Sequence, residues 1–183
     1  MPVRPRHQRR PLAWTIGLLV VLTSCNGAGP LDVEQEPGWL CTPVGPTRQV
    51  TVGLDTLTNS GSGDVRIDDV ELVSPTSGLA LTDAMIVPVG SDLVGVHLGY
   101  PPAADELPDG VLWGRGVPAG QARIPAGDVP VWNLVVGLAL DESVDSATTE
   151  GFAVEYEYLG QKYRYRTPNR VTLEARPCQP PDE

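Results

Sequence analysis

Basic side chains are scarce in this sequence, and lysine occurs only once, at Lys162. The 183 residues include 13 Lys and Arg and 23 Asp and Glu, which gives a formal net charge of −10. Nucleic-acid binding requires clustered Lys or Arg that displace the counterions of a phosphate backbone. The composition therefore excludes nucleic acid as a partner.

Residue types that carry out catalysis or bind cofactors are also sparse. Only one histidine, His97, and one methionine, Met85, follow the first 24 residues, which is too few for a copper site built from several Met and His ligands. The three cysteines lack the spacing of a zinc site, and no Gly-x-Ser-x-Gly segment is present. We therefore predict no catalytic residue, no metal site and no cofactor, and we expect His97 to face solvent from a strand.

The first 24 residues have the three parts of a secretory signal. Residues 1–11 contain four arginines and no acid, residues 12–24 are almost uninterruptedly apolar, and small residues precede Cys25. Thirteen apolar residues span about 20 Å as a helix, which is short of the roughly 30 Å hydrocarbon core of a bilayer. This pattern indicates a signal peptide that is removed.

The four residues Leu22-Thr23-Ser24-Cys25 resemble the lipobox of bacterial lipoproteins. The resemblance implies that Cys25 is the lipidation site, carrying a diacylglyceryl group with two acyl chains such as palmitate. Cys25 would then begin the mature chain and anchor it to the extracytoplasmic face of the cell membrane. Arginine outnumbers lysine by twelve to one, and Gly, Pro, Ala and Val are plentiful, so the chain also resembles lipoproteins of high-GC Gram-positive bacteria. The alternative is an ordinary signal peptide with a cysteine near its cleavage site.

Lipidation of Cys25 would leave Cys41 and Cys178 as an even pair in an oxidising compartment, so we predict a disulfide between them. In the loop-entropy description, closing so long a loop stabilises the fold by roughly 5 kcal/mol. Four of the 13 basic residues precede Cys25, so the mature chain has 9 basic and 23 acidic residues, a formal net charge of −14.

The remaining chain is predicted to form one domain. We assign residues 25–40, rich in Gly, Pro and acid, to a lipidated tether, residues 41–178 to the domain and residues 179–183 to a disordered tail. Strict apolar alternation begins in residues 49–55, where Val50, Val52 and Leu54 are expected to face inward.

Short strands separated by turn signals, without a convincing amphipathic helix, recur along the rest of the domain. This pattern predicts an all-β, antiparallel, immunoglobulin-like sandwich of about eight or nine strands, preceded by a signal-peptide helix and a flexible tether. Residues 59–67 also resemble the hairpins of bacterial immunoglobulin-like domains, with Asn59, Gly61, Val65 and Ile67 in the shared positions.

Three segments allow finer predictions. The apolar phase of residues 65–73 changes at the acidic pair 68–69, which predicts a β-bulge there. A two-residue turn at 159–160 predicts a hairpin in which Tyr156 lies opposite Tyr163, Val154 opposite Tyr165, Glu157 opposite Lys162 and Glu155 opposite Arg164. Residues 131–140 are apolar on both faces, which is typical of a central strand.

Residues 101–130 are rich in proline and glycine and lack sustained periodicity. A loop of this length in a compact domain is usually functional, so we expect any recognition surface here. Trp113 and Arg115 are the possible partner contacts, because both residue types supply interface hot spots. The alternative is that Trp113 packs back on the sandwich.

These observations favour a membrane-anchored, extracytoplasmic module with a binding or structural role and no enzymatic activity. Its partners would be the membrane, through the lipid anchor, and an unidentified envelope protein or glycan. Two alternatives stay open. One is a cell-wall hydrolase using a carboxylate pair, whose spacing a sequence does not reveal; the other is a calcium-stabilised adhesion module, suggested by the acidic charge.

Overall fold

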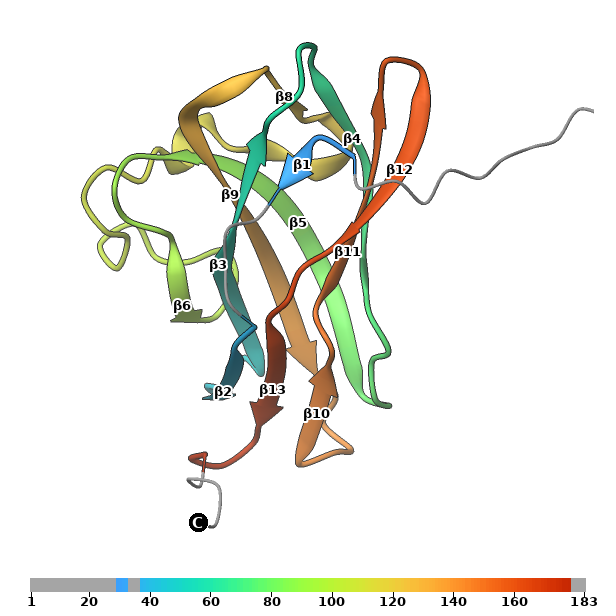
Figure 1. Ribbon diagram of the computed structural model, residues 1–183. Helices are drawn as coiled ribbons and strands as arrows, with labels where there is room; N and C mark the ends of the chain where they lie inside the picture. Colours follow the sequence, from blue (N-terminus) through green and yellow to red (C-terminus); the bar gives the residue numbers. More distant parts are fainter. Residues whose placement is uncertain (1–28, 33–36, 179–183) are drawn as a thin grey trace, which may run out of the picture.

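The computed structural model describes residues 29–32 and 37–178, which form two packed β layers (Figure 1). The predicted signal peptide (1–24), Cys25 and the tail (179–183) lie outside the described residues. Helical structure in the described ranges consists of two short 3-10 turns, η1 (Trp113–Arg115) and η2 (Ala119–Gln121). Within those ranges, no helix has the length and apolarity to span a membrane.

The first layer is an antiparallel sheet with the strand order β1-β3-β9-β5-β7, and β6 pairs with β3 beside this path. Its strands are β1 (Leu31–Asp32), β3 (Gln49–Asn59), β5 (Leu79–Val89), β6 (Gly95–Leu98), β7 (Val117–Pro118) and β9 (Gly127–Leu140). The strand β9 pairs with both β3 and β5. The central position predicted for residues 131–140 is confirmed.

The second layer consists of two smaller sheets, ordered β12-β11-β4-β8 and β10-β13-β2. Their strands are β2 (Trp39–Pro43), β4 (Val65–Leu72), β8 (Arg123–Ile124), β10 (Ser146–Thr149), β11 (Phe152–Tyr158), β12 (Gln161–Arg166) and β13 (Arg170–Glu174). All described pairings are antiparallel except that of β13 with β2, which is parallel. The all-β antiparallel sandwich is thus confirmed, with one parallel pair added. The described strands number thirteen instead of eight or nine, partly because β1, β7 and β8 are two-residue strands without a readable periodicity.

The main core lies between the layers. Its largest fully buried side chains come from both layers and include Tyr156, Phe152, Leu57, Ile67 and Ile86. Each such side chain contributes about 1.5–3 kcal/mol relative to exposure.

A second apolar cluster covers the outer face of the first layer. Val87, Val89, Val94 and Val135 are buried there, and Trp113 packs against them. The segment predicted as a recognition loop therefore lies partly over the sheet, and its residues 113–124 form η1, β7, η2 and β8. This second cluster explains why β9 is apolar on both faces.

The register of the C-terminal half agrees with the sequence patterns. Tyr156 pairs with Tyr163 and Glu155 with Arg164, so the hairpin register is confirmed. Glu155 also pairs with Asp69 and Tyr156 with Ile67, which leaves Asp68 as the extra residue of a bulge at the predicted site.

The strand β3 departs from its predicted alternation. Its register with β9 shifts between Val52 and Asp55, so that Asp55 and Leu57 point inward and Leu54 is only half-buried. Gly53 permits this irregularity, because a Cβ at that position would lie 2.7 Å from the Cβ of Val94. Val50 and Val52 are buried as predicted, Leu54 packs against the core while only partly buried, and Asp55 is the residue that is fully buried after the shift.

The described parts of the predicted tether are also more ordered than expected. Leu31 is buried, and the two residues of β1 pair with β3, while Trp39 and Leu40 begin β2. The Tyr156 hydroxyl hydrogen-bonds the backbone of Leu31. Two parts of residues 25–40 thus belong to the domain, which begins before Cys41.

Candidate functional site

The outer face of the β10-β13-β2 sheet presents an aromatic ring among hydroxyls and charges. The parallel register places Trp39 beside Arg170 and Cys41 beside Thr172, and the antiparallel register places Thr148 beside Thr172. Paired residues on neighbouring strands point to the same side of a sheet, and successive residues alternate. We name this surface the Trp39 face and define it by Trp39, Cys41, Thr148, Glu150, Arg170 and Thr172.

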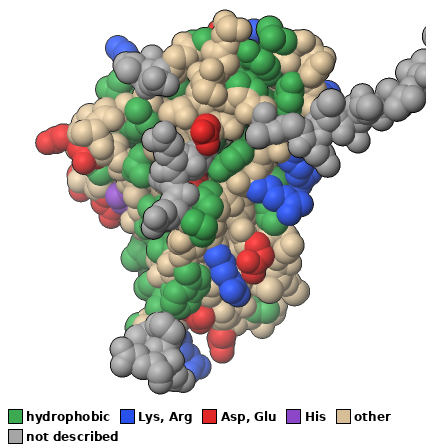
Figure 2. Space-filling model, viewed as in Figure 1, with side chains coloured by type: hydrophobic (Ala, Val, Ile, Leu, Met, Phe, Trp, Pro, Cys, Tyr) green, Lys and Arg blue, Asp and Glu red, His purple; other side chains and the backbone are tan. Residues whose placement is uncertain are grey.

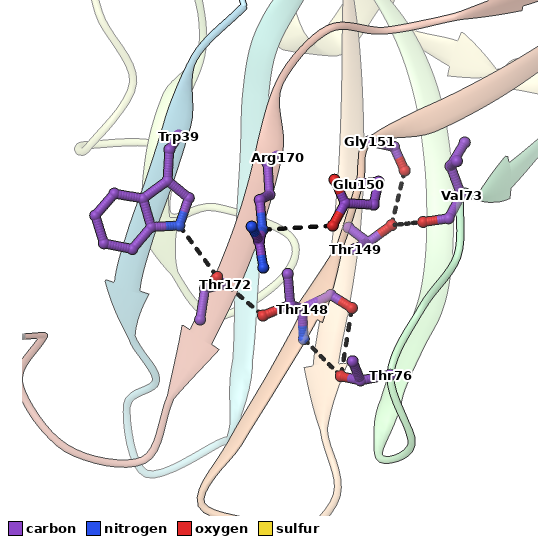
Figure 3. A network of polar contacts seen from close by, with 9 residues as sticks. All are labelled: Trp39, Val73, Thr76, Thr148, Thr149, Glu150, Gly151, Arg170 and Thr172. Atoms are coloured by element: carbon purple, nitrogen blue, oxygen red, sulfur yellow. Dashed lines mark hydrogen bonds and ion pairs between the residues drawn. The ribbon is translucent and has the colours of Figure 1, made fainter. Parts of the chain in front are cut away.

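Trp39 lies exposed at one side of this face, with 51% of its surface accessible. Its indole Nε1 donates a hydrogen bond to Thr172 Oγ1 over 3.3 Å. Figure 3 shows the indole nearly face-on, with the hydrogen-bonding edge turned toward β13. The ring is thus held by one edge, and about half of the residue's surface is accessible.

Threonines beneath and beside the ring form a connected network (Figure 3). The hydroxyls of Thr172 and Thr148 lie 3.0 Å apart, and the Thr148 amide donates to Thr76 Oγ1 over 2.8 Å. The Thr76 amide in turn donates to the Thr148 carbonyl over 2.8 Å. Because Thr172 is buried and Thr76 tethers the sheet edge, the network holds the face in one arrangement.

An ion pair lies beside the network, and its arginine is the strand partner of Trp39. Arg170 Nε lies 3.6 Å from Glu150 Oε1, and about half of each side chain is exposed. Figure 2 shows a basic and an acidic group side by side near hydrophobic surface over β2, β13 and β10. Such an exposed pair adds only ~0–1 kcal/mol to stability. Its polar atoms are therefore available for other contacts at little cost to the fold.

The disulfide predicted between Cys41 and Cys178 is confirmed, with the two Cα atoms 6.1 Å apart. Cys41 lies two residues after Trp39 on the same side of β2. The bridge therefore fastens the C-terminal segment to the strand that carries Trp39.

A buried carboxyl supports the face from inside. Asp55 is 1% exposed, and its Oδ1 accepts a hydrogen bond from Asn169 Nδ2 over 2.7 Å. Burial raises the pKa of Asp55 from 3.8 to about 6, although the hydrogen bonds from Asn169 and Thr167 lower it. Arg170, which follows Asn169 in the chain, donates a hydrogen bond from its backbone amide to the carbonyl of Gly38 over 2.9 Å. A buried acid thus positions the segment that leads into the Trp39 face.

A second candidate is a hollow of about 240 Å³ between β4 and β5, lined by Asp69, Asp83 and Ala119 among others. Asp83 Oδ2 accepts a hydrogen bond from the Tyr100 hydroxyl over 3.0 Å. Each aspartate also accepts the amide of the following residue over 2.8 Å. Both aspartates are exposed.

The residues singled out in the sequence are dispersed. Trp113 is half-buried, and its ring meets that of Tyr100 edge-on at 6.5 Å, whereas Arg115 is exposed. Contact of these two residues with a partner stays a prediction. Cys25 lies outside the described residues.

The prediction that His97 faces solvent is wrong. Its side chain is only 13% exposed, with Nε2 2.6 Å from the Val94 carbonyl and Nδ1 3.7 Å from Glu106 Oε2. The histidine is held between two parts of the loop that covers the first layer. Across residues 29–32 and 37–178, no group of three or more His, Cys, Asp or Glu side chains is placed to hold a metal ion.

Trp39 was missed because it lies in the segment assigned to the tether. Its position in the sequence could have indicated otherwise, because Trp39 lies only two residues before Cys41. The disulfide of Cys41 ties this part of the chain to the domain. The parallel partner β13, more than 130 residues later, leaves no local trace in the sequence.

No protein-family profile matches this sequence, and no curated protein matches it either. Four chains of known structure do match. One is the VesB protease of Vibrio cholerae, at 12% identity and a TM-score of 0.38, over 79% of this chain and 32% of the protease. This chain thus spans about a third of that protein's length. Another is the ASH/PapD-like domain 7 of human CEP192, at 11% identity and a TM-score of 0.40, over 94% of this chain and the whole of that domain.

Proposed function

We propose that this chain is a lipid-anchored, extracytoplasmic module that binds a component of the cell envelope through the Trp39 face and catalyses no reaction. The observation that carries the proposal is Trp39 itself. The exposed surface of the Trp39 indole, which is hydrogen-bonded through its Nε1, adds little to the stability of the fold. Burying that surface against a ligand would be favourable.

The cysteines support the anchor. Two of the three form the disulfide, which leaves Cys25, directly after Leu22-Thr23-Ser24, for lipidation. Leu31 is buried in the domain only six residues after Cys25. Six residues reach at most about 20 Å, so a lipid on Cys25 would hold the domain against the membrane surface.

The acids support a non-catalytic role. Asp55 is the single buried acid among the described residues, and its Oδ1 is engaged by Asn169. The two aspartates of the hollow between β4 and β5 are exposed, whereas the general acid of a carboxylate-pair enzyme typically lies in an apolar, buried environment.

The anchor is tested by expressing the full chain and Cys25→Ser and separating membrane from soluble fractions. The native chain is expected in the membrane fraction with a diacylated cysteine by mass spectrometry, and the variant in the soluble or secreted fraction or retained with its signal peptide. An unmodified Cys25 in the native chain would contradict the anchor.

The binding surface is tested by mixing full-length protein, in a detergent without a sugar headgroup, with isolated cell envelopes. Trp39→Ala is expected to lose envelope binding. Leu159→Ala is the matched control, because Leu159 is 73% exposed but lies in the hairpin turn at the opposite end of the second layer. Equal retention of both variants by the envelope would refute the assignment of the Trp39 face.

A further inference from the structure

We infer that the ligand of the Trp39 face is an uncharged polysaccharide, bound as an extended chain with one sugar ring stacked on the indole of Trp39. The inference rests on the proposed function and gives its ligand a chemical class. It is carried by the charge, the shape and the hydrogen-bonding groups of the face.

Charge argues for an uncharged ligand. The sequence has a formal net charge of −10, which repels acidic polymers at a distance. On the face itself, Arg170 is the positive group, and Glu150 lies 3.6 Å from its Nε. Glu174, at the far end of β13, adds a further negative charge and accepts a hydrogen bond from Ser146. The face therefore has no surplus of positive charge with which to attract an anion.

The exposed ring argues for a partner with a flat C–H surface. An aromatic π-face is electron-rich, so it attracts the slightly positive hydrogens of C–H groups. A pyranose ring whose hydroxyls point outward around its rim has such a surface above and below. Because Nε1 of Trp39 is already bonded to Thr172, the indole is oriented before any ligand arrives, and binding costs little side-chain ordering.

The neighbouring polar groups suit the rim of the same sugar chain. A guanidinium donates hydrogen bonds and a carboxylate accepts them, so the Arg170–Glu150 pair offers both functions to adjacent hydroxyls. Hydrogen bonds to charged groups are about twice as strong as those between neutral groups. Figure 3 shows Trp39, Arg170 and Glu150 in succession across the sheet.

The extent of the face argues for a polymer. Neighbouring strands lie about 4.8 Å apart, so contacts from β2 across β13 to Glu150, which follows β10, extend over roughly 10 Å. This length exceeds one sugar ring, so the groups can contact more than one sugar unit of a chain that crosses the strands. A protein partner would instead favour a fully desolvated apolar centre, and here the centre is a threonine network.

The test measures depletion of full-length protein from solution by insoluble chitin and cellulose, both uncharged, and by polygalacturonate beads, which are anionic. The same sugar-free detergent is used throughout, and circular dichroism verifies that each variant is folded. We expect binding to at least one uncharged polymer, weak binding to polygalacturonate, and little change when about 0.5 M NaCl screens charge interactions.

The variants then identify the surface. Trp39→Ala is expected to weaken binding to the uncharged polymer about tenfold or more, as for stacking of a nucleobase on an aromatic side chain. Trp39→Phe should retain part of the affinity, Arg170→Ala and Glu150→Gln should each weaken it several-fold, and Leu159→Ala should leave it unchanged. These results together would support the inference.

The inference would be overturned by full binding of Trp39→Ala, by no binding of the native protein to either uncharged polymer, or by tighter binding to polygalacturonate. Envelope binding that depends on Trp39 but disappears after protease treatment of the envelope would also overturn it. In that case the proposed function would stand with a protein partner. Loss of the anchor in the Cys25 experiment, by contrast, would leave these solution measurements unaffected.

Discussion

Replacing Asp55 by Asn should make the protein more stable at neutral and alkaline pH. The carboxyl is buried, and its pKa of about 6 in the folded state exceeds the ordinary value of 3.8 because burial disfavours the charged form. The folded chain thus holds this proton more tightly than the unfolded chain. The stability that the proton confers is complete below about pH 4 and is lost as the pH rises through 6.

The size of the effect follows from the two pKa values. A difference of about 2 pH units corresponds to about 3 kcal/mol at 1.36 kcal/mol per unit. An Asn side chain resembles the protonated acid in shape and charge. Its oxygen can accept from Asn169, and the Thr167 hydroxyl can accept from its amide, since a hydroxyl both donates and accepts.

The assay is urea unfolding followed by tryptophan fluorescence at pH 4.5, 6 and 8, for the native chain and Asp55→Asn. The variant is expected to gain up to about 3 kcal/mol over the native chain at pH 8 and much less at pH 4.5. Asp105→Asn, at an exposed loop position, is the control and should show no such gain. A native stability that rises from pH 4.5 to 8 while the variant does not would refute the reasoning.

Three further predictions concern the fold, each measured by urea unfolding. Replacing Cys41 and Cys178 together by Ser should cost about 2–5 kcal/mol, and an unchanged midpoint would contradict the role of the bridge. Asn59→Ala should cost about 2–4 kcal/mol, because its Nδ2 donates to two backbone carbonyls at 2.8 and 2.9 Å that would lose this donor. Gly137→Ala should cost about 1–3 kcal/mol and shift Trp113 fluorescence, since the new Cβ would lie 2.6 Å from the Tyr100 ring; an unaltered spectrum would show that this ring does not cover Gly137.

The parts of the fold that sequence patterns predicted are those set by neighbouring residues. The 159–160 turn fixes the hairpin register, because Tyr156 and Tyr163 are only seven residues apart and both faces of the pair are matched. The bulge at Asp68 was readable because two acids interrupt an otherwise regular alternation.

The parts that were missed depend on distant residues. Asp55 points inward because Gly53 allows the chain to approach Val94, which lies in a later loop. The outer cluster on β9 similarly requires the long loop to fold back, which proline and glycine content does not reveal. Trp39 lies among the other residues of its face because β2 pairs in parallel with β13, and sequence patterns do not reveal this pairing.

If Cys25 carries the proposed lipid, the short stretch of chain between it and Trp39 has a mechanical consequence. A force that separates the membrane from a ligand on the Trp39 face would be transmitted mainly between Cys25 and β2, so most of the sandwich would lie outside the loaded path. The two residue pairs of β1 with β3 lie on this path. The five parallel pairs of β2 with β13 would then resist sliding together, and the covalent link from Cys41 to Cys178 would prevent β2 from being drawn out of the domain.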